Sequence, residues 1–157
     1  MDPLVGKNIL ITGASSGIGR ALAVEAAKSG ANLSLAARNL SKLNELKDEL
    51  DTYGVKVTVV ATDVTQESDC FHFINQSIEH LGSIDILINN AGISMRAPFE
   101  DVKTEVLKEI MDVNLWGAVH CTKAALPQLL KNKGSLVAVS SVTGFKGLPG
   151  RSGYASS

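Results

Sequence analysis

A glycine-rich segment, TGASSGIG at residues 12–19, has the spacing of a turn that binds phosphate. It lies between a short apolar segment and a segment of helical period, which is the setting that such a turn requires. Gly13 allows a sharp turn, Gly17 lets the backbone approach a pyrophosphate, and Gly19 permits close packing of helix on strand. The helix would offer unpaired N–H groups and the positive end of its dipole. A plain Gly-Ser connector is the alternative, but this position favours phosphate binding.

Strands and helices are predicted to alternate along the chain, without a repeat or a low-complexity linker. This order predicts the α/β class, with a doubly wound parallel sheet of Rossmann type and helices on both faces. Its ligand is expected beyond the carboxyl ends of the strands. Strands are expected at 7–12, 32–37, 55–62, 84–90 and 134–141. Helices are expected at 18–30, at 41–51 with Ser41 as N-cap, at 66–81, at 102–111, and at 114–131 with a bend at Pro127.

Composition excludes several other classes of protein. The 157 residues are 45% hydrophobic, which suits one domain with a buried core. A net charge of −1 gives no reason to expect a nucleic acid or a membrane surface as partner. The apolar run near the N-terminus breaks at Gly13, so a soluble, cytoplasmic protein is expected. Neither Cys70 nor Cys121 has metal-ligand spacing around it, so we predict reduced thiols and no metal site.

Four motifs, in order, resemble those of the classical short-chain dehydrogenase/reductase family. They are the GxxxGxG spacing of the turn, NNAG at 89–92, VNLWG at 113–117, and VAVSSVTG at 137–144 followed by GYASS at 153–157. The resemblance covers essentially the whole chain and disfavours a flavodoxin-like or other doubly wound domain. It implies an oxidoreductase that transfers a hydride between a nicotinamide cofactor and a small-molecule carbonyl or alcohol.

The end of the second predicted strand bears on which nicotinamide cofactor binds. Members of the family that use NAD carry an acidic residue there, which binds the ribose hydroxyls. In this chain Ala37 holds that position and Arg38 follows it. A planar guanidinium suits the 2′-phosphate of NADP. We therefore predict NADP(H), with NAD as the less favoured cofactor; the alternative for Arg38 is an ordinary solvated loop arginine.

The resemblance also assigns the adenosine end of the cofactor site. Asp63 and Val64 match the position that binds the adenine ring, although a turn stabilised by the Asp63 side chain is the alternative. The NNAG motif would form the floor under the adenosine, with Asn89 left as a structural residue. The complete set of expected cofactor-binding residues is Gly13, Ser15, Ser16, Gly17, Ile18, Gly19, Arg38, Asp63, Val64, Asn90, Ala91 and Gly92.

Three catalytic residues follow from the resemblance: Tyr154, Ser141 and Asn114. Tyr154 would be the general acid/base, and Ser141 would hydrogen-bond the substrate oxygen. Ser140 is the alternative to Ser141 and is expected to be a strand residue. Asn114 would hold a local break in its helix and a water that relays protons; a helix N-cap is the alternative.

The family places a lysine four residues after this tyrosine, where its charge lowers a tyrosine pKa that is otherwise near ~10. The sequence ends at Ser157, one residue before that position. A single NAD(P)-binding domain over 1–157, truncated on the C-terminal side and lacking the last strands, is therefore expected. It should expose an apolar edge at 135–141 and be inactive by itself. A non-catalytic dinucleotide-binding module or pseudoenzyme is the alternative, and the parent protein is expected to be a homo-oligomer.

Overall fold

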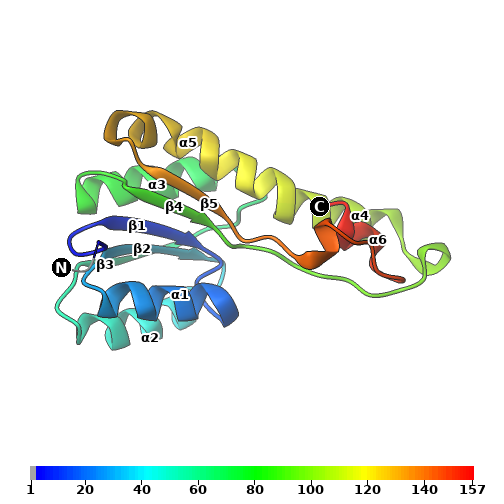
Figure 1. Cartoon of the computed structure of the whole chain (residues 1–157), viewed down its shortest axis with the longest axis horizontal. Helices are drawn as coiled ribbons and strands as arrows, with labels where there is room; N and C mark the ends of the chain where they lie inside the picture. Colours follow the sequence, from blue (N-terminus) through cyan, green and yellow to red (C-terminus); the bar gives the residue numbers. More distant parts are fainter. Residues whose placement is uncertain (1–2) are drawn as a thin grey trace.

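A five-stranded parallel sheet forms the centre of the computed structural model, which describes residues 3–157. The strands are β1 (Asn8–Thr12), β2 (Asn32–Ala37), β3 (Val57–Ala61), β4 (Ile86–Asn89) and β5 (Ser135–Ala138), in the order β3-β2-β1-β4-β5. Helices α1 (Gly17–Lys28) and α2 (Leu40–Asp51) cover one face, and α3 (Glu67–Leu81) and α5 (Gly117–Asn132) cover the other (Figure 1). The predicted α/β, doubly wound sheet is confirmed, and its strand order reverses direction between β1 and β4.

Successive side chains of each buried strand point to opposite faces of the sheet, so the core is divided into two apolar clusters, one on each face. Ile9 and Ile11 of β1 pack toward α1 and α2, whereas Leu10 between them packs toward α3 and α5. Cys70 and Cys121 are free and buried in the second cluster. Hydrogen bonding with Cys70 and burial raise the pKa of the Cys121 thiol above its usual range, so that thiol stays protonated.

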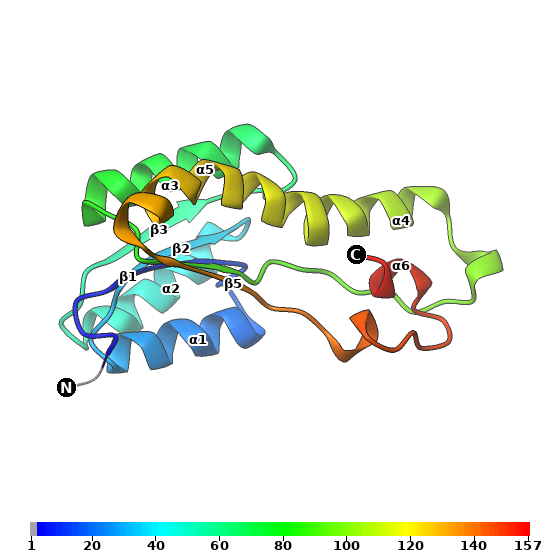
Figure 2. The same ribbon diagram turned by 45° about the horizontal axis from the view of Figure 1, so that its top comes forward.

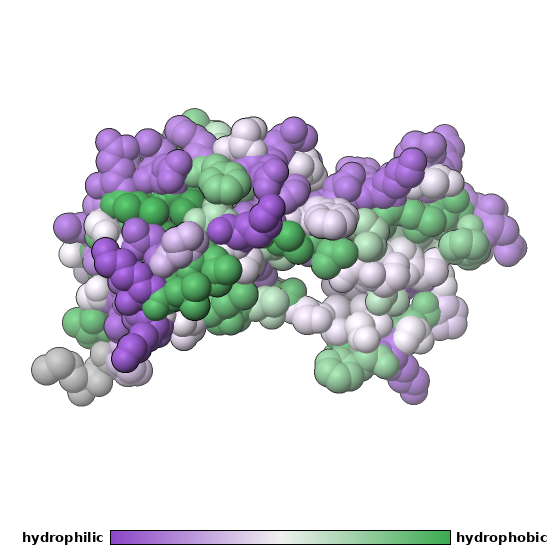
Figure 3. Space-filling view, turned by 90° about the horizontal axis from the view of Figure 1, so that it is seen from above, coloured by the Kyte–Doolittle hydropathy of each residue, from purple (hydrophilic) through white to green (hydrophobic). Residues whose placement is uncertain are grey.

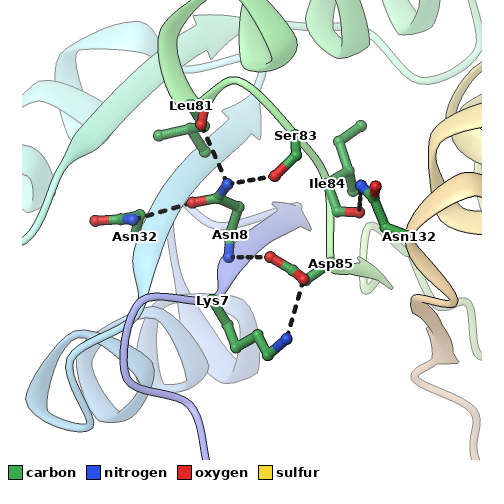
Figure 4. A network of polar contacts seen from close by, with 8 residues as sticks. All are labelled: Lys7, Asn8, Asn32, Leu81, Ser83, Ile84, Asp85 and Asn132. Atoms are coloured by element: carbon green, nitrogen blue, oxygen red, sulfur yellow. Dashed lines mark hydrogen bonds and ion pairs between the residues drawn. The ribbon is translucent and has the colours of Figure 1, made fainter.

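A polar network closes the amino ends of the strands (Figure 4). The Asn8 side chain donates to Leu81 O at 3.2 Å and to Ser83 Oγ at 2.9 Å, and it accepts from Asn32 Nδ2 at 3.0 Å. The Asp85 carboxylate accepts from the Asn8 backbone N–H at 2.9 Å. These bonds tie the starts of β1, β2 and β4 together.

Two local predictions are wrong. Helix α2 is capped by Asn39 rather than Ser41, because Asn39 Oδ1 accepts from the Lys42 backbone N–H at 3.0 Å while Ser41 lies inside the first turn. Strand β5 ends at Ala138, so Ser140 is not a strand residue. Beyond Val139, whose N–H still bonds to Asn89 O, no strand within residues 3–157 continues the ladder.

The two helices expected at 102–111 and 114–131 form one continuous helical rod (Figure 2). It consists of α4 (Thr104–Met111), a π-helical segment η2 (Asp112–Trp116) and α5, which continues through Pro127. The rod extends from the sheet to a smaller lobe beyond the carboxyl ends of the strands, where α6 (Ser152–Ala155) also lies (Figure 1). Short 3-10 helices η1 (Phe99–Asp101) and η3 (Val142–Gly144) complete the elements.

Strand β5 forms one edge of the sheet, and all four of its residues are exposed, as predicted for this apolar edge. From above, the molecule narrows between the body that holds the sheet and the smaller lobe, and apolar side chains reach the surface in both parts (Figure 3). Among residues 3–157, no helix is long and apolar enough to span a bilayer.

Candidate active site

A single cavity of about 740 Å³ lies at the carboxyl ends of the strands and holds nearly all of the predicted site residues. It is bordered by the glycine turn, the end of β2, the loop after β3, the segment after β4, the π-helical segment, and the segment that joins β5 to α6. The predicted residues that line it are Gly13, Ser15, Ser16, Gly17, Ile18, Arg38, Asp63, Val64, Asn90, Ala91, Gly92, Asn114, Ser141 and Tyr154.

Gly19 is the predicted residue that does not line this cavity, and it is buried beneath the glycine turn. A Cβ at this position would overlap Asn90 Nδ2 and lie 2.6 Å from Gly13 O. Gly19 therefore allows helix α1 to pack directly against the turn and the segment after β4.

Hydrogen bonds from Thr12 and Asn90 fix the glycine turn against the NNAG segment. Thr12 Oγ1 accepts from the backbone N–H groups of Asn90 and Ala91, both at 3.0 Å. Asn90 Nδ2 donates to Thr12 O at 2.9 Å and to Gly13 O at 3.2 Å. Thr12 was not among the expected site residues, although it opens the TGASSGIG segment.

Asn89, expected to be structural, lines the cavity and is also buried, with 8% exposure. Its Nδ2 donates to Thr122 Oγ1 of α5 at 3.0 Å. Among the described residues, its Oδ1 is the one buried side-chain nitrogen or oxygen atom without a hydrogen-bond partner. A buried acceptor of this kind is costly unless a water or a ligand satisfies it.

The side chain of Asp63 forms a local turn, the alternative role expected from the sequence. Asp63 Oδ1 accepts from the Thr65 N–H at 3.0 Å and from Thr65 Oγ1 at 2.9 Å. The same residue also lines the cavity, so local structure and ligand contact are compatible at this position.

Asn114 lies in the π-helical segment and is not a helix N-cap, since helix continues on both sides of it. Its Oδ1 accepts from Ile93 N–H at 2.8 Å, and its Nδ2 donates to Ile93 O at 3.0 Å and to Ser157 Oγ at 2.8 Å. The amide therefore joins the helical rod to the segment that follows NNAG.

Ser141 and Tyr154 face the cavity from the segment after β5. Ser141 Oγ accepts from Thr143 N–H at 3.3 Å and from Thr143 Oγ1 at 3.0 Å. Because both contacts use the oxygen as acceptor, its own proton is free to bond elsewhere. The guanidinium carbon of Arg151 lies 6.0 Å from the centroid of the Tyr154 ring.

No group of three or more His, Cys, Asp or Glu side chains that could hold a metal ion occurs within residues 3–157. The polar groups around the cavity are glycine backbone, hydroxyls, amides, the Asp63 carboxylate and one exposed guanidinium. Such a set can bind a phosphorylated organic ligand and exchange a proton with it.

Solved structures that match the fold of this chain include proteins with either nicotinamide cofactor. A xylitol dehydrogenase with bound NAD⁺ superposes with a TM-score of 0.94 at 29% identity, over 98% of this chain and 60% of that one. An alcohol dehydrogenase from the archaeon Thermococcus sibiricus, in complex with 5-hydroxy-NADP, superposes with a TM-score of 0.93 at 32% identity, over 96% and 64% of the two chains.

Curated relatives include plant enzymes named after steroid oxidation. The chain is 42% identical over 158 aligned positions to the 11-beta-hydroxysteroid dehydrogenase-like 2 protein of Arabidopsis thaliana, covering 99% of this chain and 51% of that protein. It is 41% identical to an 11-beta-hydroxysteroid dehydrogenase of Pinus massoniana, over 98% and 44% of the two. This chain thus spans about half the length of the curated relatives it matches.

The sequence pattern of the short chain dehydrogenase family matches residues 7–157, from the start of β1 through the segment that carries Tyr154. The motifs that led to this family from the sequence are the ones that surround the cavity in the structure. The relatives named above are oxidoreductases of the same family. The chain belongs to the short-chain dehydrogenase/reductase family.

Proposed function

We propose that this protein is an NADP(H)-dependent oxidoreductase that interconverts a carbonyl and an alcohol on a small molecule. The observation that carries the proposal is the convergence of four separate sequence motifs on one cavity at the carboxyl ends of the strands. A doubly wound sheet binds dinucleotides at this edge, beside the point where strand order reverses. We also propose that the parent protein is a homo-oligomer.

The residues of the turn fit a dinucleotide. Gly17 has a φ of 56°, and a Cβ there would meet no atom within 4 Å, so its backbone borders open space. Helix α1 begins at this residue and has no acidic side chain in its first turn. Its N–H groups and its dipole can therefore receive a pyrophosphate without competition from a carboxylate.

The end of β2 supports NADP(H) over NAD(H). Ala37 offers no carboxylate to the ribose, and Arg38 is exposed at the cavity with no ion pair to another described residue. A guanidinium without a partner can form a charge-assisted, bidentate contact with a 2′-phosphate. When bound, NADPH would supply the hydride.

The Ser141 hydroxyl would donate a hydrogen bond to the substrate oxygen, while keeping its proton, and stabilise negative charge that develops there. The Tyr154 hydroxyl would give or take the proton of the reaction. Asn114 would fix the position of Ile93 and organise the water that carries protons away. Exposed apolar side chains in the segment between Ser141 and Tyr154, namely Val142, Phe145 and Leu148, would contact an apolar part of the substrate.

Calorimetric titration with NADPH and NADH tests the cofactor assignment. The unsubstituted protein is expected to bind NADPH at least about tenfold more tightly, and Arg38→Ala should remove most of that difference, because one charge-assisted contact is worth about 1.5–3 kcal/mol. Lys56→Ala, which removes one exposed positive charge at the start of β3, is the control and should change neither affinity.

Equal affinity for both cofactors, or no effect of Arg38→Ala, would contradict the assignment of NADP(H). Failure to bind either cofactor would contradict the dinucleotide site itself. Tyr154→Phe and Ser141→Ala are expected to keep NADPH affinity and to remove turnover in any form of the protein that shows it.

A further inference from the structure

The backbone carbonyl of Val64 is held by two side chains from the helices behind it. His120 Nδ1 lies 3.2 Å from Val64 O, and Cys70 Sγ donates to the same oxygen at 3.5 Å. A carbonyl oxygen only accepts hydrogen bonds, so Nδ1 of His120 carries the hydrogen. Val64 is 8% exposed, and its remaining exposed surface lines the cavity.

Gly117 lets helix α5 come close enough for this contact. A Cβ at position 117 would lie 2.7 Å from Val64 Cγ2 and 2.9 Å from Val64 Cβ, which is closer than real Cβ atoms approach. Glycine costs a helix up to about 1 kcal/mol relative to alanine. The direct packing of the α5 backbone on Val64 explains why a glycine, despite this cost, is present at position 117.

The surroundings of Val64 are fixed on both sides. Asp63 N–H donates to Asp69 Oδ2 at 3.2 Å, and Asp63 Oδ1 binds Thr65. The ring of Trp116, the last residue of the π-helical segment, stacks on His120 of α5 with centroids 6.5 Å apart and planes 30° from parallel, which restrains the imidazole. The orientation of the Val64 peptide therefore depends on α5.

We propose that His120 and Gly117 are positioning residues for the adenine end of the cofactor. Neither residue lines the cavity, whereas Val64 and Asp63 do. His120 fixes the carbonyl of Val64 and Gly117 sets how closely α5 supports it, so together they set the wall against which the adenine ring lies. This inference rests on the proposed function, because it assumes that the cavity binds an adenine dinucleotide.

The positions of Gly117 and His120 on the helical rod make their effect on cofactor binding specific. Asn114 contacts Ile93 from the π-helical segment, and Gly117 and His120 contact Val64 from the start of α5. A change at His120 should thus act on the adenine end and leave the end near Asn114 and Tyr154 unchanged. A role limited to global stability would affect both ends alike.

Two fragments of the cofactor separate these cases when each is titrated into the purified chain. Adenosine 2′,5′-bisphosphate probes the adenine end, and reduced nicotinamide mononucleotide probes the other. His120→Leu is expected to weaken the bisphosphate about threefold to tenfold, the range that loss of one hydrogen bond produces. His120→Asn, whose amide N–H can replace Nδ1–H, should stay within about twofold of the unsubstituted protein. The mononucleotide should bind equally to all three.

Gly117→Ala provides a second variant that does not depend on the histidine. Alanine favours the helix, so folding is expected to be kept, while its Cβ displaces Val64 and weakens only the bisphosphate by about threefold or more. Unchanged bisphosphate affinity in both His120→Leu and Gly117→Ala would overturn the inference, and so would equal weakening of both fragments. If the unsubstituted chain bound neither NADPH nor the bisphosphate, both the proposed function and this inference would be wrong.

Discussion

The two ends of the sheet differ in how their polar groups are satisfied. At the amino ends, Asn8, Asn32 and Asp85 bond to one another and to neighbouring loops (Figure 4). At the carboxyl ends, Asn89 Oδ1 is buried without a partner among the described residues, and Gly17 borders open space. Because the same strands supply both ends, the contrast separates groups that stabilise the fold from groups left available to a ligand.

The contrast also explains why the carboxyl end tolerates groups that cost stability. A buried acceptor without a partner, such as Asn89 Oδ1, is unfavourable in the free protein. A ligand or water that supplies a donor would offset this cost. Substitutions at the amino end should therefore change the free energy of unfolding alone, whereas those at the carboxyl end should change cofactor binding.

The largest expected effect is that of Gly19→Ala on cofactor binding. The added Cβ would overlap Asn90 Nδ2 and Gly13 O, so the glycine turn and the NNAG segment must separate. NADPH affinity, measured by calorimetry, should fall about 100-fold, equivalent to about 2.7 kcal/mol. Gly54→Ala, in a loop with open space around it, is the control for glycine replacement; it should keep NADPH affinity. Unaltered affinity in Gly19→Ala would show that the turn can relax.

Asn8→Ala should be the most destabilising change at the amino end. It leaves Leu81 O, Ser83 Oγ and Asn32 Nδ2 without their Asn8 partner, so the free energy of unfolding should fall by about 2–3 kcal/mol in urea denaturation. NADPH affinity should not change at temperatures where the variant is folded. Weaker NADPH binding by the folded variant would break the proposed separation of the two ends.

Thr12→Val tests a residue at which stability and binding meet. Valine keeps the shape of threonine but leaves the N–H groups of Asn90 and Ala91 without their acceptor. We expect a loss of about 1–2 kcal/mol in the free energy of unfolding and about tenfold weaker NADPH binding. Thr12→Ser retains the acceptor, and should recover the NADPH affinity; if it does not, the methyl group rather than the hydroxyl matters.

Lys7→Ala should have the smallest effect. The ion pair of Lys7 Nζ with Asp85 Oδ1, at 3.2 Å, lies at the surface with half of the Lys7 side chain exposed, and surface pairs contribute about 0–1 kcal/mol. Urea denaturation should show a change of no more than about 0.5 kcal/mol and no change in NADPH binding. A larger loss would mean that the charge of Lys7 is needed to hold Asp85 against Asn8.

The sequence was sufficient to predict the order of strands and helices, because buried parallel strands are continuous apolar runs and their crossover helices have a clear period. It also predicted which segments come together around the cavity, because parallel strands deliver the segments that follow them to one edge. It did not show that α4 and α5 form one rod. The π-helical segment preserves helical continuity through VNLWG, where a break between two helices was expected.

Contacts between segments that are distant in the sequence could not be predicted from sequence patterns. His120 is 56 residues from Val64, and its contact arises only when α5 packs beside the loop after β3. Gly117 inside a helix was the one available signal, since an unfavourable residue in a helix suggests a close approach. The cap of α2 was misplaced because Asn39 and Ser41 are both good N-cap residues, and only the backbone at Asn39 has the extended geometry of a cap.

Amide hydrogen exchange with and without NADPH tests the central contrast most directly. Loop amides exchange through local opening, so their protection reports contact with the ligand rather than overall stability. We predict that NADPH slows exchange in residues 13–19, 38–39, 63–66 and 90–94, at the carboxyl ends of the strands, and leaves the loops at 52–56 and 82–85 unchanged. Equal protection at both ends, or protection confined to the amino end, would contradict a dinucleotide site in this cavity.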